Sequence, residues 1–456
     1  MSGVAVLSRR AALGVAGAAA VARPRSAKAA GVIQVWWTQG YYQAEDQALK
    51  DLVARFEKET GQKVDLQIHT GSDLITKLIA AVQVGDVPDA VQSVTGGTFF
   101  QPRAVWNDQI LDISDVVATQ ETLFLPAALD ACRYYNKATK KRSLYAVPIK
   151  CATLMEQIWR PLVEDAGFSA EDIPATQDAF FDFFQVVQDK LRSKGKRIYG
   201  LGFSMATKEA DSNNLFHSFL VAYGGEKIVS PEGVLNIEDP KVLKAISTSL
   251  ERLTTPYKKG YVPAGAINWG DVDNNNAFYA RQIVMTPNAT ISIAVAQIEK
   301  QEQYFKEIIT RGIPAGNDGK PVPNILGVTS AFIPKAAKNI EGGKTFLKWF
   351  IQPANLNTYL KQARGRWLPV MPSALKEDPY WLDPTDPHRP VAAKYALILP
   401  AIPQYQTFTP AYAQMISEQL WAGAEANITQ KGMTPDQATE IVVKRAKEIF
   451  GQFPMG

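Results

Sequence analysis

Two kinds of hydrophobic spacing alternate in the first part of the sequence, and this alternation restricts the fold more than any other feature. Val32–Trp37 and Lys63–His69 have the period of two expected of strands. Between them, Glu45–Thr60 places apolar residues at helical spacing and is closed by Gly61. A strand, a helix and a second strand in this order predict a layered α/β fold.

The same alternation continues along a chain that is too long for one core. The sequence has 456 residues, whereas a single hydrophobic core rarely serves more than about 250–300. A helix is predicted at Leu74–Val84, followed by a strand after Pro88-Asp89, and an extended run broken by Pro148 precedes a new α/β series. We therefore expect two lobes, with the chain crossing between them near Pro148.

The last third of the sequence contains two kinds of segment. Gly343–Leu360, Pro410–Glu425 and Pro435–Phe450 have the one-sided apolar spacing of helices. Asp378–Pro410 is rich in proline and predicts an irregular connector.

Residues 1–29 have the three parts of an export signal and are excluded from the fold. Arg9 and Arg10 precede the apolar stretch Ala11–Ala22, and Ala27-Lys28-Ala29 offers a small-residue cleavage site. The arginine pair and the alanine-rich apolar stretch indicate the twin-arginine type. No cysteine stands near the cleavage site, so we expect a periplasmic protein without a lipid anchor.

The basic character of the sequence comes from this signal. The formal charge is +4 for the full sequence, and removal of residues 1–29, which hold five basic and no acidic residues, lowers it to −1. A nucleic-acid partner requires a basic surface on the folded part of the chain, so we expect none.

Cysteine and histidine are too few and too scattered for a metal or cofactor site. Cys132 and Cys151 match no metal-binding spacing, and His69, His217 and His388 are far apart in the sequence. We expect no metal and no cofactor. Whether the two cysteines form a disulfide is left open, because export permits one and free cysteine is also a common core residue.

Short catalytic motifs are missing, which weakens but does not close the possibility of an enzyme. The sequence has no nucleophile elbow, phosphate-binding loop or zinc-protease motif. Glycoside hydrolysis needs only two carboxylates and has no local spacing rule. Glu156, Glu209 and Asp211 are the candidates for that chemistry.

Aromatic residues gather where predicted strands end, and this is the main indication of a binding site. Tyr41 and Tyr42 follow the first strand, Trp269 lies in a polar loop, and Trp367 follows two arginines. Ligands of α/β sheets bind beyond the carboxyl ends of strands. A sugar ring fits flat aromatics with polar side chains around them. Strand alternation sends Trp36 and Trp37 to opposite faces, so one of them should be core.

The order of several segments resembles the extracellular solute-binding proteins of ABC importers, in the sugar-binding family that includes maltodextrin-binding protein. The segments are FEKETGQKV, IAAVQVGDVPDAV, LYAVPI, AFYARQIVMTPNA, GVTSAFIPKAAKNIEGGKTFLKWFI and RGRWLPVMPSAL. The resemblance covers nearly all of the chain after the signal. One departure is Ala280-Arg281, where Gly-Lys is common in the family.

The resemblance implies a two-lobed periplasmic-binding-protein fold with three crossings between the lobes. The first lobe would comprise residues 30–143 and 331–367, and the second residues 149–327 and 370–456. The ligand would lie in a cleft between the lobes, closed by a hinge motion. The protein would act as a monomer, perform no chemistry and deliver its ligand to the ABC permease.

The ligand contacts that we expect come from both lobes and from the crossings. They are Trp37, Thr38, Gln39, Tyr41, Tyr42, Thr95, Lys150, Trp269, Asn288, Arg366 and Trp367. A carbohydrate or sugar derivative is the favoured ligand. Lys150, Arg364 and Arg366 keep open an acidic sugar or another organic anion. A phosphorylated polyol, a polyamine or a secreted carbohydrate-active enzyme are the further alternatives.

Overall fold

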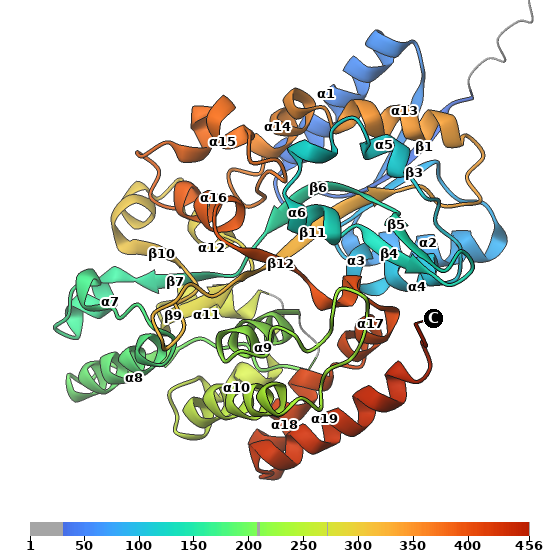
Figure 1. Cartoon of the computed structure of the whole chain (residues 1–456). Coiled ribbons are helices and arrows are strands. Elements are labelled where there is room, and N and C mark those ends of the chain that lie inside the picture. The colour runs from blue at the N-terminus through green and yellow to red at the C-terminus, as the bar shows by residue number, and fades with distance from the viewer. Residues whose placement is uncertain (1–30, 208–209, 271, 456) are drawn as a thin grey trace, which may run out of the picture.

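Two large β-sheets, each with its own hydrophobic core, organise the protein (Figure 1). The structure is a computed structural model that describes residues 31–207, 210–270 and 272–455. The predicted twin-arginine signal, residues 1–29, lies outside these residues.

The first sheet is built around the strand–helix–strand unit that the sequence predicts. Its order is β12-β11-β3-β1-β2, with β6 paired to β11 beside this path. Strand β1 pairs in parallel with β2 and β3, and α1 connects β1 to β2. The strands are β1 Ile33–Thr38, β2 Val64–His69, β3 Ala90–Ser93, β6 Val147–Ala152, β11 Asn324–Phe332 and β12 Ala401–Pro403.

The helices that pack with this sheet come from two distant parts of the chain. They are α1 Gln43–Thr60, α2 Gly71–Val84, α13 Ile340–Phe350 and α14 Pro353–Lys361. Helices α1 and α2 end at Gly61 and Gly85, both with φ of 72°. Glycine adopts this left-handed conformation readily, which is why it stops both helices. Shorter elements complete this part: α3 Gly96–Phe99, α4 Gln101–Trp106, α5 Ser114–Val117, α6 Pro126–Asp130, β4 Arg133–Asn136 and β5 Lys141–Leu144.

The second sheet has the order β10-β7-β9-β8 and packs with helices from the middle and the end of the chain. Its strands are β7 Met155–Trp159, β8 Tyr199–Leu201, β9 Ile283–Asn288 and β10 Ile308–Gly312. The helices are α7 Arg160–Asp165, α8 Gln177–Ser193, α9 Ala210–Ala222, α10 Pro240–Lys258, α11 Asp273–Tyr279, α12 Ser292–Val295, α17 Pro410–Ser417, α18 Leu420–Lys431 and α19 Pro435–Phe450.

Three segments of the described chain join the two halves. Strand β6 belongs to the first sheet and is followed after Thr153-Leu154 by β7 of the second sheet. Strand β11 returns the chain from β10 to the first sheet. The third segment passes beside β6, where Leu368 forms an isolated bridge with Cys151, and after α16 and β12 it reaches α17 of the second half. This is the two-lobed α/β architecture with three crossings that the resemblance implies. The residue limits of the two lobes remain a prediction.

The proline-rich segment that was expected to be irregular contains a helix and a strand. These are α16 (Arg389–Leu397) and β12, and the short α15 (Ala374–Glu377) lies just before the segment. The expectation was wrong because Pro390 occupies the first turn of α16, where a missing N–H costs nothing. Ala392, Ala393 and Ala396 of this helix pack into the first core.

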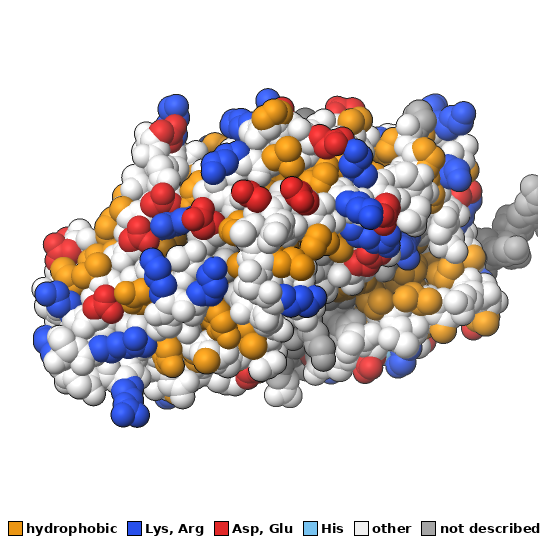
Figure 2. Space-filling model, turned by 90° about the horizontal axis from the view of Figure 1, so that it is seen from below, with side chains coloured by type: hydrophobic (Ala, Val, Ile, Leu, Met, Phe, Trp, Pro, Cys, Tyr) orange, Lys and Arg blue, Asp and Glu red, His pale blue; other side chains and the backbone are white. Residues whose placement is uncertain are grey.

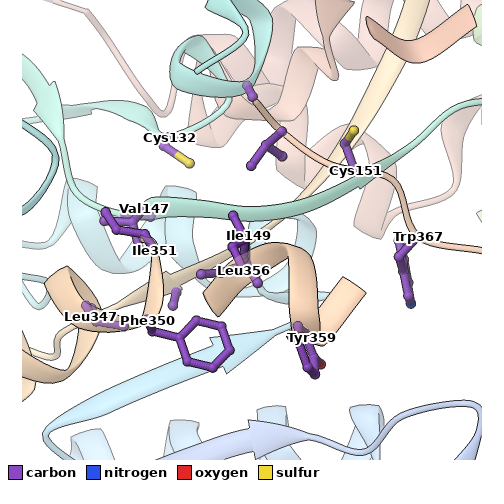
Figure 3. Close-up of a cluster of buried hydrophobic side chains, with 14 of the residues drawn as sticks. Cys132, Val147, Ile149, Cys151, Leu347, Phe350, Ile351, Leu356, Tyr359 and Trp367 are labelled. Atoms are coloured by element: carbon purple, nitrogen blue, oxygen red, sulfur yellow. The ribbon is translucent and has the colours of Figure 1, made fainter. Parts of the chain in front are cut away.

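Trp37 is central to the first core. It has no exposed surface, and its ring centroid lies 4.8 Å from that of Phe350. Its Nε1–H donates to the hydroxyl of Tyr359 at 3.1 Å. Figure 3 shows Phe350 and Tyr359 in this cluster, together with Leu347 and Leu356 of the same two helices. Helices α13 and α14 therefore cover the face of β1 that carries Trp37.

Cys132 and Cys151 are both buried and free, which answers the question that the sequence leaves open. Figure 3 shows their sulfur atoms apart from each other. The Cys151 thiol donates to the carbonyl oxygen of Pro369 at 3.1 Å. Burial raises the pKa of both thiols, so neither is poised to react.

We predict that the purified protein holds two reduced thiols. Dithionitrobenzoate should react with neither in the native state and with both in denaturant, because the folded chain shields them. The measurement is the absorbance of released thionitrobenzoate without added reductant. Failure to detect thiols after unfolding would contradict the structure.

We predict that Trp37→Ala lowers the free energy of unfolding by about 3–5 kcal/mol, because it leaves a cavity in the first core. The measurement is denaturant unfolding followed by circular dichroism. Tyr41→Ala is the matched control, since the Tyr41 side chain is 53% exposed and its removal leaves no cavity. Equal losses in the two variants would contradict the placement of Trp37.

Candidate functional site

The turn after β1, which we call the tyrosine turn, comprises Gly40, Tyr41 and Tyr42. The rings of Tyr41 and Tyr42 meet edge to face with centroids 5.0 Å apart. Tyr41 is exposed, and Tyr42 is half-buried against the first core. The turn thus presents an aromatic surface at the carboxyl end of a central strand, where α/β sheets bind ligands.

Two carboxylates of the first turn of α1 hold the tyrosine turn. Glu45 Oε1 accepts the backbone N–H groups of Tyr41 and Tyr42 at 3.0 and 3.1 Å. Asp46 Oδ1 accepts the N–H of Gly40 at 2.8 Å. Carboxylates are favoured at a helix N-terminus by the dipole and by unpaired amides. The conformation of the turn therefore depends on side chains of the helix that follows it.

The third crossing brings two arginines onto the tyrosine rings. The guanidinium carbon of Arg366 lies 4.7 Å from the Tyr41 ring centroid and 4.9 Å from that of Trp367. Arg364 approaches the Tyr42 ring at 5.6 Å and forms an ion pair with Glu299 at 3.6 Å. Cation–π contacts of this kind orient both partners.

The backbone between these two arginines adopts a left-handed conformation. Arg364 and Gly365 both have positive φ, at 53° and 88°. A Cβ added at Gly365 would lie 3.1 Å from Ile291 Cδ1. The loop of the third crossing thus packs closely on the segment that follows β9.

Lys150 of β6 lies beneath this cluster and is buried. Its ammonium lies 4.6 Å from the Trp367 ring centroid and 3.8 Å from Glu45 Oε2. It also donates to the Tyr359 hydroxyl at 3.5 Å. Burial lowers the pKa of Lys150 to about 8, and the nearby Glu45 opposes that shift.

The second lobe contributes a tyrosine that the sequence analysis missed. Tyr279 ends α11, and burial together with the nearby Tyr41 and Tyr42 raises the pKa of its hydroxyl. Its hydroxyl donates to the carbonyl oxygen of Ile293 at 3.3 Å. Tyr279 lies just before β9, whereas the aromatic residues considered from the sequence follow strands.

The Tyr42 hydroxyl has no hydrogen-bond partner among the described residues, although the oxygen is buried. Burial, and after it the adjacent Tyr41, raises the pKa of Tyr42 to about 12. A buried hydroxyl without a partner costs free energy. This oxygen therefore has unused hydrogen-bonding capacity beside the aromatic pair.

The other predicted ligand contacts are placed as follows. Trp37 lies in the core, and Thr38 is buried, with its N–H on Gln92 Oε1 at 3.1 Å. Gln39 is exposed and lines a groove of about 510 Å³ with Asp46 and Lys50.

Three further predicted contacts lie in other parts of the fold. Thr95 is half-buried at the start of α3, and Trp269 is half-buried against the second core. Asn288 ends β9, and its Nδ2 donates to the carbonyl oxygen of Thr290 at 2.8 Å. Among the described residues, no hydrogen bond, ion pair or ring contact joins Thr95 or Trp269 to the tyrosine turn.

Two of the three carboxylates considered for glycoside hydrolysis lie among the described residues, on different elements. Glu156 is buried in β7, and burial raises its pKa to about 8. Asp211 is half-buried in the first turn of α9, and Glu209 lies outside the described residues.

Within residues 31–207, 210–270 and 272–455, no three His, Cys, Asp or Glu side chains gather so as to hold a metal ion. In the same ranges no helix has both the length and the apolarity to cross a membrane. On the face shown in Figure 2, acidic and basic side chains are intermixed.

Comparison with known proteins gives one family match and several matches of fold. The model of the family described as bacterial extracellular solute-binding protein matches residues 51–390. None of the curated proteins matches the sequence.

The solved structures that are similar share the fold at low sequence identity. A solute-binding protein of an ABC transporter from Thermotoga lettingae, bound with α-D-tagatose, is 20% identical over 93% of this chain and 100% of that chain, with a TM-score of 0.68. MalE3 of T. maritima, bound to maltose, is 16% identical over 92% and 100%, with a TM-score of 0.69. The GacH receptor of Streptomyces glaucescens, studied with acarbose, is 17% identical over 93% and 100%, with a TM-score of 0.71.

Proposed function

Because the chain belongs to the bacterial extracellular solute-binding proteins, we propose that it captures a carbohydrate or sugar derivative and delivers it to an ABC importer. The observation that carries the proposal is the aromatic cluster at the tyrosine turn, which receives side chains from the third crossing and from the second lobe. Structural relatives that bind tagatose, maltose and acarbose support the ligand class.

The proposed ligand site is smaller than the set of residues predicted from the sequence. Its centre comprises Tyr41, Tyr42, Arg366 and Tyr279, with Trp367 behind Arg366. Flat rings suit the C–H face of a sugar, and the Tyr42 hydroxyl suits one of its hydroxyl groups. Gln39, Thr95, Trp269 and Asn288 are proposed as outer contacts. Trp37 is left out, because it has no exposed surface.

The charges of the cluster favour a neutral sugar over an anion. Lys150 is compensated by Glu45, Arg364 by Glu299, and Arg366 lies against two aromatic rings. An anion binds best where cations lack such partners and can form bidentate hydrogen bonds. The acidic sugar that the three cations suggest in the sequence is therefore the second candidate.

Closure of the two lobes is the proposed mechanism of capture. The tyrosine turn and Tyr279 come from different lobes, so a ligand between them would bind the closed form more tightly than the open form. Such a ligand shifts the equilibrium towards closure, and the permease would recognise the closed form. The lobes would comprise residues 30–143 with 331–367 and residues 149–327 with 370–456, except that α16 of the last range packs into the first core.

The cellular setting follows from the family and the N-terminal segment. We propose that residues 1–29 are a twin-arginine signal removed on export, and that the protein acts in the periplasm without a lipid anchor. It would be a monomer that binds its ligand without chemical change, since the family consists of binding proteins.

We predict that neutral saccharides raise the melting temperature of the mature protein, because a ligand that binds only the folded state stabilises it by mass action. The measurement is a thermal-shift screen with neutral sugars, acidic sugars, polyamines and organic acids. A shift from one of the non-sugar classes alone would overturn the carbohydrate assignment.

We predict that Tyr42→Phe weakens binding of the sugar found in that screen by about tenfold, the loss expected for one hydrogen bond of about 1.4 kcal/mol. The free energy of unfolding should not fall, because the hydroxyl has no protein partner among the described residues. The measurement is isothermal titration calorimetry. Tyr261→Phe is the control. The Tyr261 hydroxyl lies away from the cluster and donates to Asp189 Oδ2 at 3.1 Å. Unchanged affinity in Tyr42→Phe would remove this hydroxyl from the site.

A further inference from the structure

Lys150 is the one predicted ligand contact whose charge is directed into the protein. Its side chain is 2% exposed, and its ammonium lies between the rings of Tyr359 and Trp367, 5.4 and 4.6 Å from their centroids. The nearest carboxylate oxygen in this environment is Glu45 Oε2, at 3.8 Å. The ammonium therefore interacts with groups of the protein itself and faces Glu45.

Glu45 uses its second oxygen on the tyrosine turn. The side chain is 1% exposed, and Oε1 accepts the N–H groups of Tyr41 and Tyr42, while Oε2 faces Lys150. One carboxylate thus connects a buried cation of β6 to the two backbone amides that fix the aromatic pair. Hydrogen bonds from amides to an ionised carboxylate are about twice as strong as those between neutral groups.

The pair is needed because neither charge has water as an alternative partner. Removing one member of a buried ion pair leaves the other charge uncompensated, and a buried carboxylate that loses its cation tends to protonate or to move towards solvent. Either response weakens the bonds from Glu45 to the turn.

We propose that Lys150 is a positioning residue for the ligand site: through Glu45 it holds the Tyr41–Tyr42 turn in the conformation that receives the sugar, without contacting the sugar itself. The link to a sugar rests on the proposed function, whereas the link from Lys150 to the turn does not.

The link from Lys150 through Glu45 to the tyrosine turn, which we call the relay, has a pH dependence whose direction is fixed by Lys150. Its pKa of about 8 means that the ammonium is mostly charged at pH 7 and mostly neutral at pH 9. The groups that face it are Glu45 and Asp46 of α1, Tyr359 of α14, and Arg366 of the third crossing. Order in the turn should therefore fall as the pH rises through about 8. For global stability the sign is opposite, because an unfolded lysine with a pKa of about 10.4 binds more protons than the folded one between these values.

Hydrogen–deuterium exchange of the ligand-free protein tests the relay directly. In Lys150→Met the amides of Tyr41 and Tyr42, which donate to Glu45, should exchange roughly tenfold faster than in the wild type at pH 7, the effect of losing a charge-assisted hydrogen bond. Protection in the wild type, corrected for intrinsic exchange, should fall between pH 7 and pH 9, and in Lys150→Met it should not change. Unchanged exchange in Lys150→Met would overturn the proposal.

Two further variants separate this role from general destabilisation. Glu45→Gln should reproduce the faster exchange, and the double variant should be no worse than either single variant, because the two residues act as one unit. Glu45→Gln also decides the matter if Lys150→Met fails to fold. Lys63→Met is the matched control: Lys63 pairs with Glu57, which accepts the N–H of Val64, but this lysine is 70% exposed. Faster exchange throughout the first lobe in Lys150→Met, and not in the turn alone, would show a merely structural role and overturn the proposal.

The experiment keeps the two proposals apart. Exchange is measured without a sugar, so failure of every saccharide in the thermal-shift screen would leave the result on Lys150 readable. Equally, a normal thermal shift with unchanged exchange in Lys150→Met would reject the relay and retain the proposed function.

Discussion

The buried ion pair between Lys150 and Glu45 lies where three parts of the chain meet. Lys150 comes from the first crossing, Glu45 from the first helix, and Trp367, whose ring faces the ammonium, from the third crossing. The aromatic pair at the end of β1 depends on this junction, because Glu45 holds its backbone. The segments that link the lobes and the segment that we propose to contact the ligand therefore share one set of interactions.

Much of the fold is readable from the sequence, because its signals are local. The period of two in β1 and β2, the helical spacing of α1, and the glycines that end α1 and α2 each act within a few residues. Alternation along β1 also indicates correctly that one of two adjacent tryptophans is core. The helix α16 escaped prediction because prolines there were read as breakers, although Pro390 lies in a first turn that accepts proline.

Part of the candidate site could be predicted from the sequence. The rest depends on contacts between residues that are far apart in the chain. Tyr41, Tyr42 and Arg366 could be named because aromatics and arginines after strands are typical of binding loops, and the structure brings these three together. Nothing local shows that Lys150 faces Glu45, so the sequence left an anionic ligand open as an alternative. Tyr279 was missed for a similar reason: only packing between the lobes decides that the last residue of α11 lies near the tyrosine turn.

The position of Trp37 has a consequence for how the chain is made. Strand β1 is among the first elements to be synthesised, whereas the helices that cover its tryptophan, α13 and α14, begin at Ile340 and end at Lys361. Until then one face of the first sheet lacks its cover, and the nascent chain carries an apolar surface that invites association with other chains. The contacts that close the first core are among the most distant in the sequence, which predisposes the first lobe to slow completion. Any truncation before Lys361 removes at least part of the helices that cover the first strand to be synthesised.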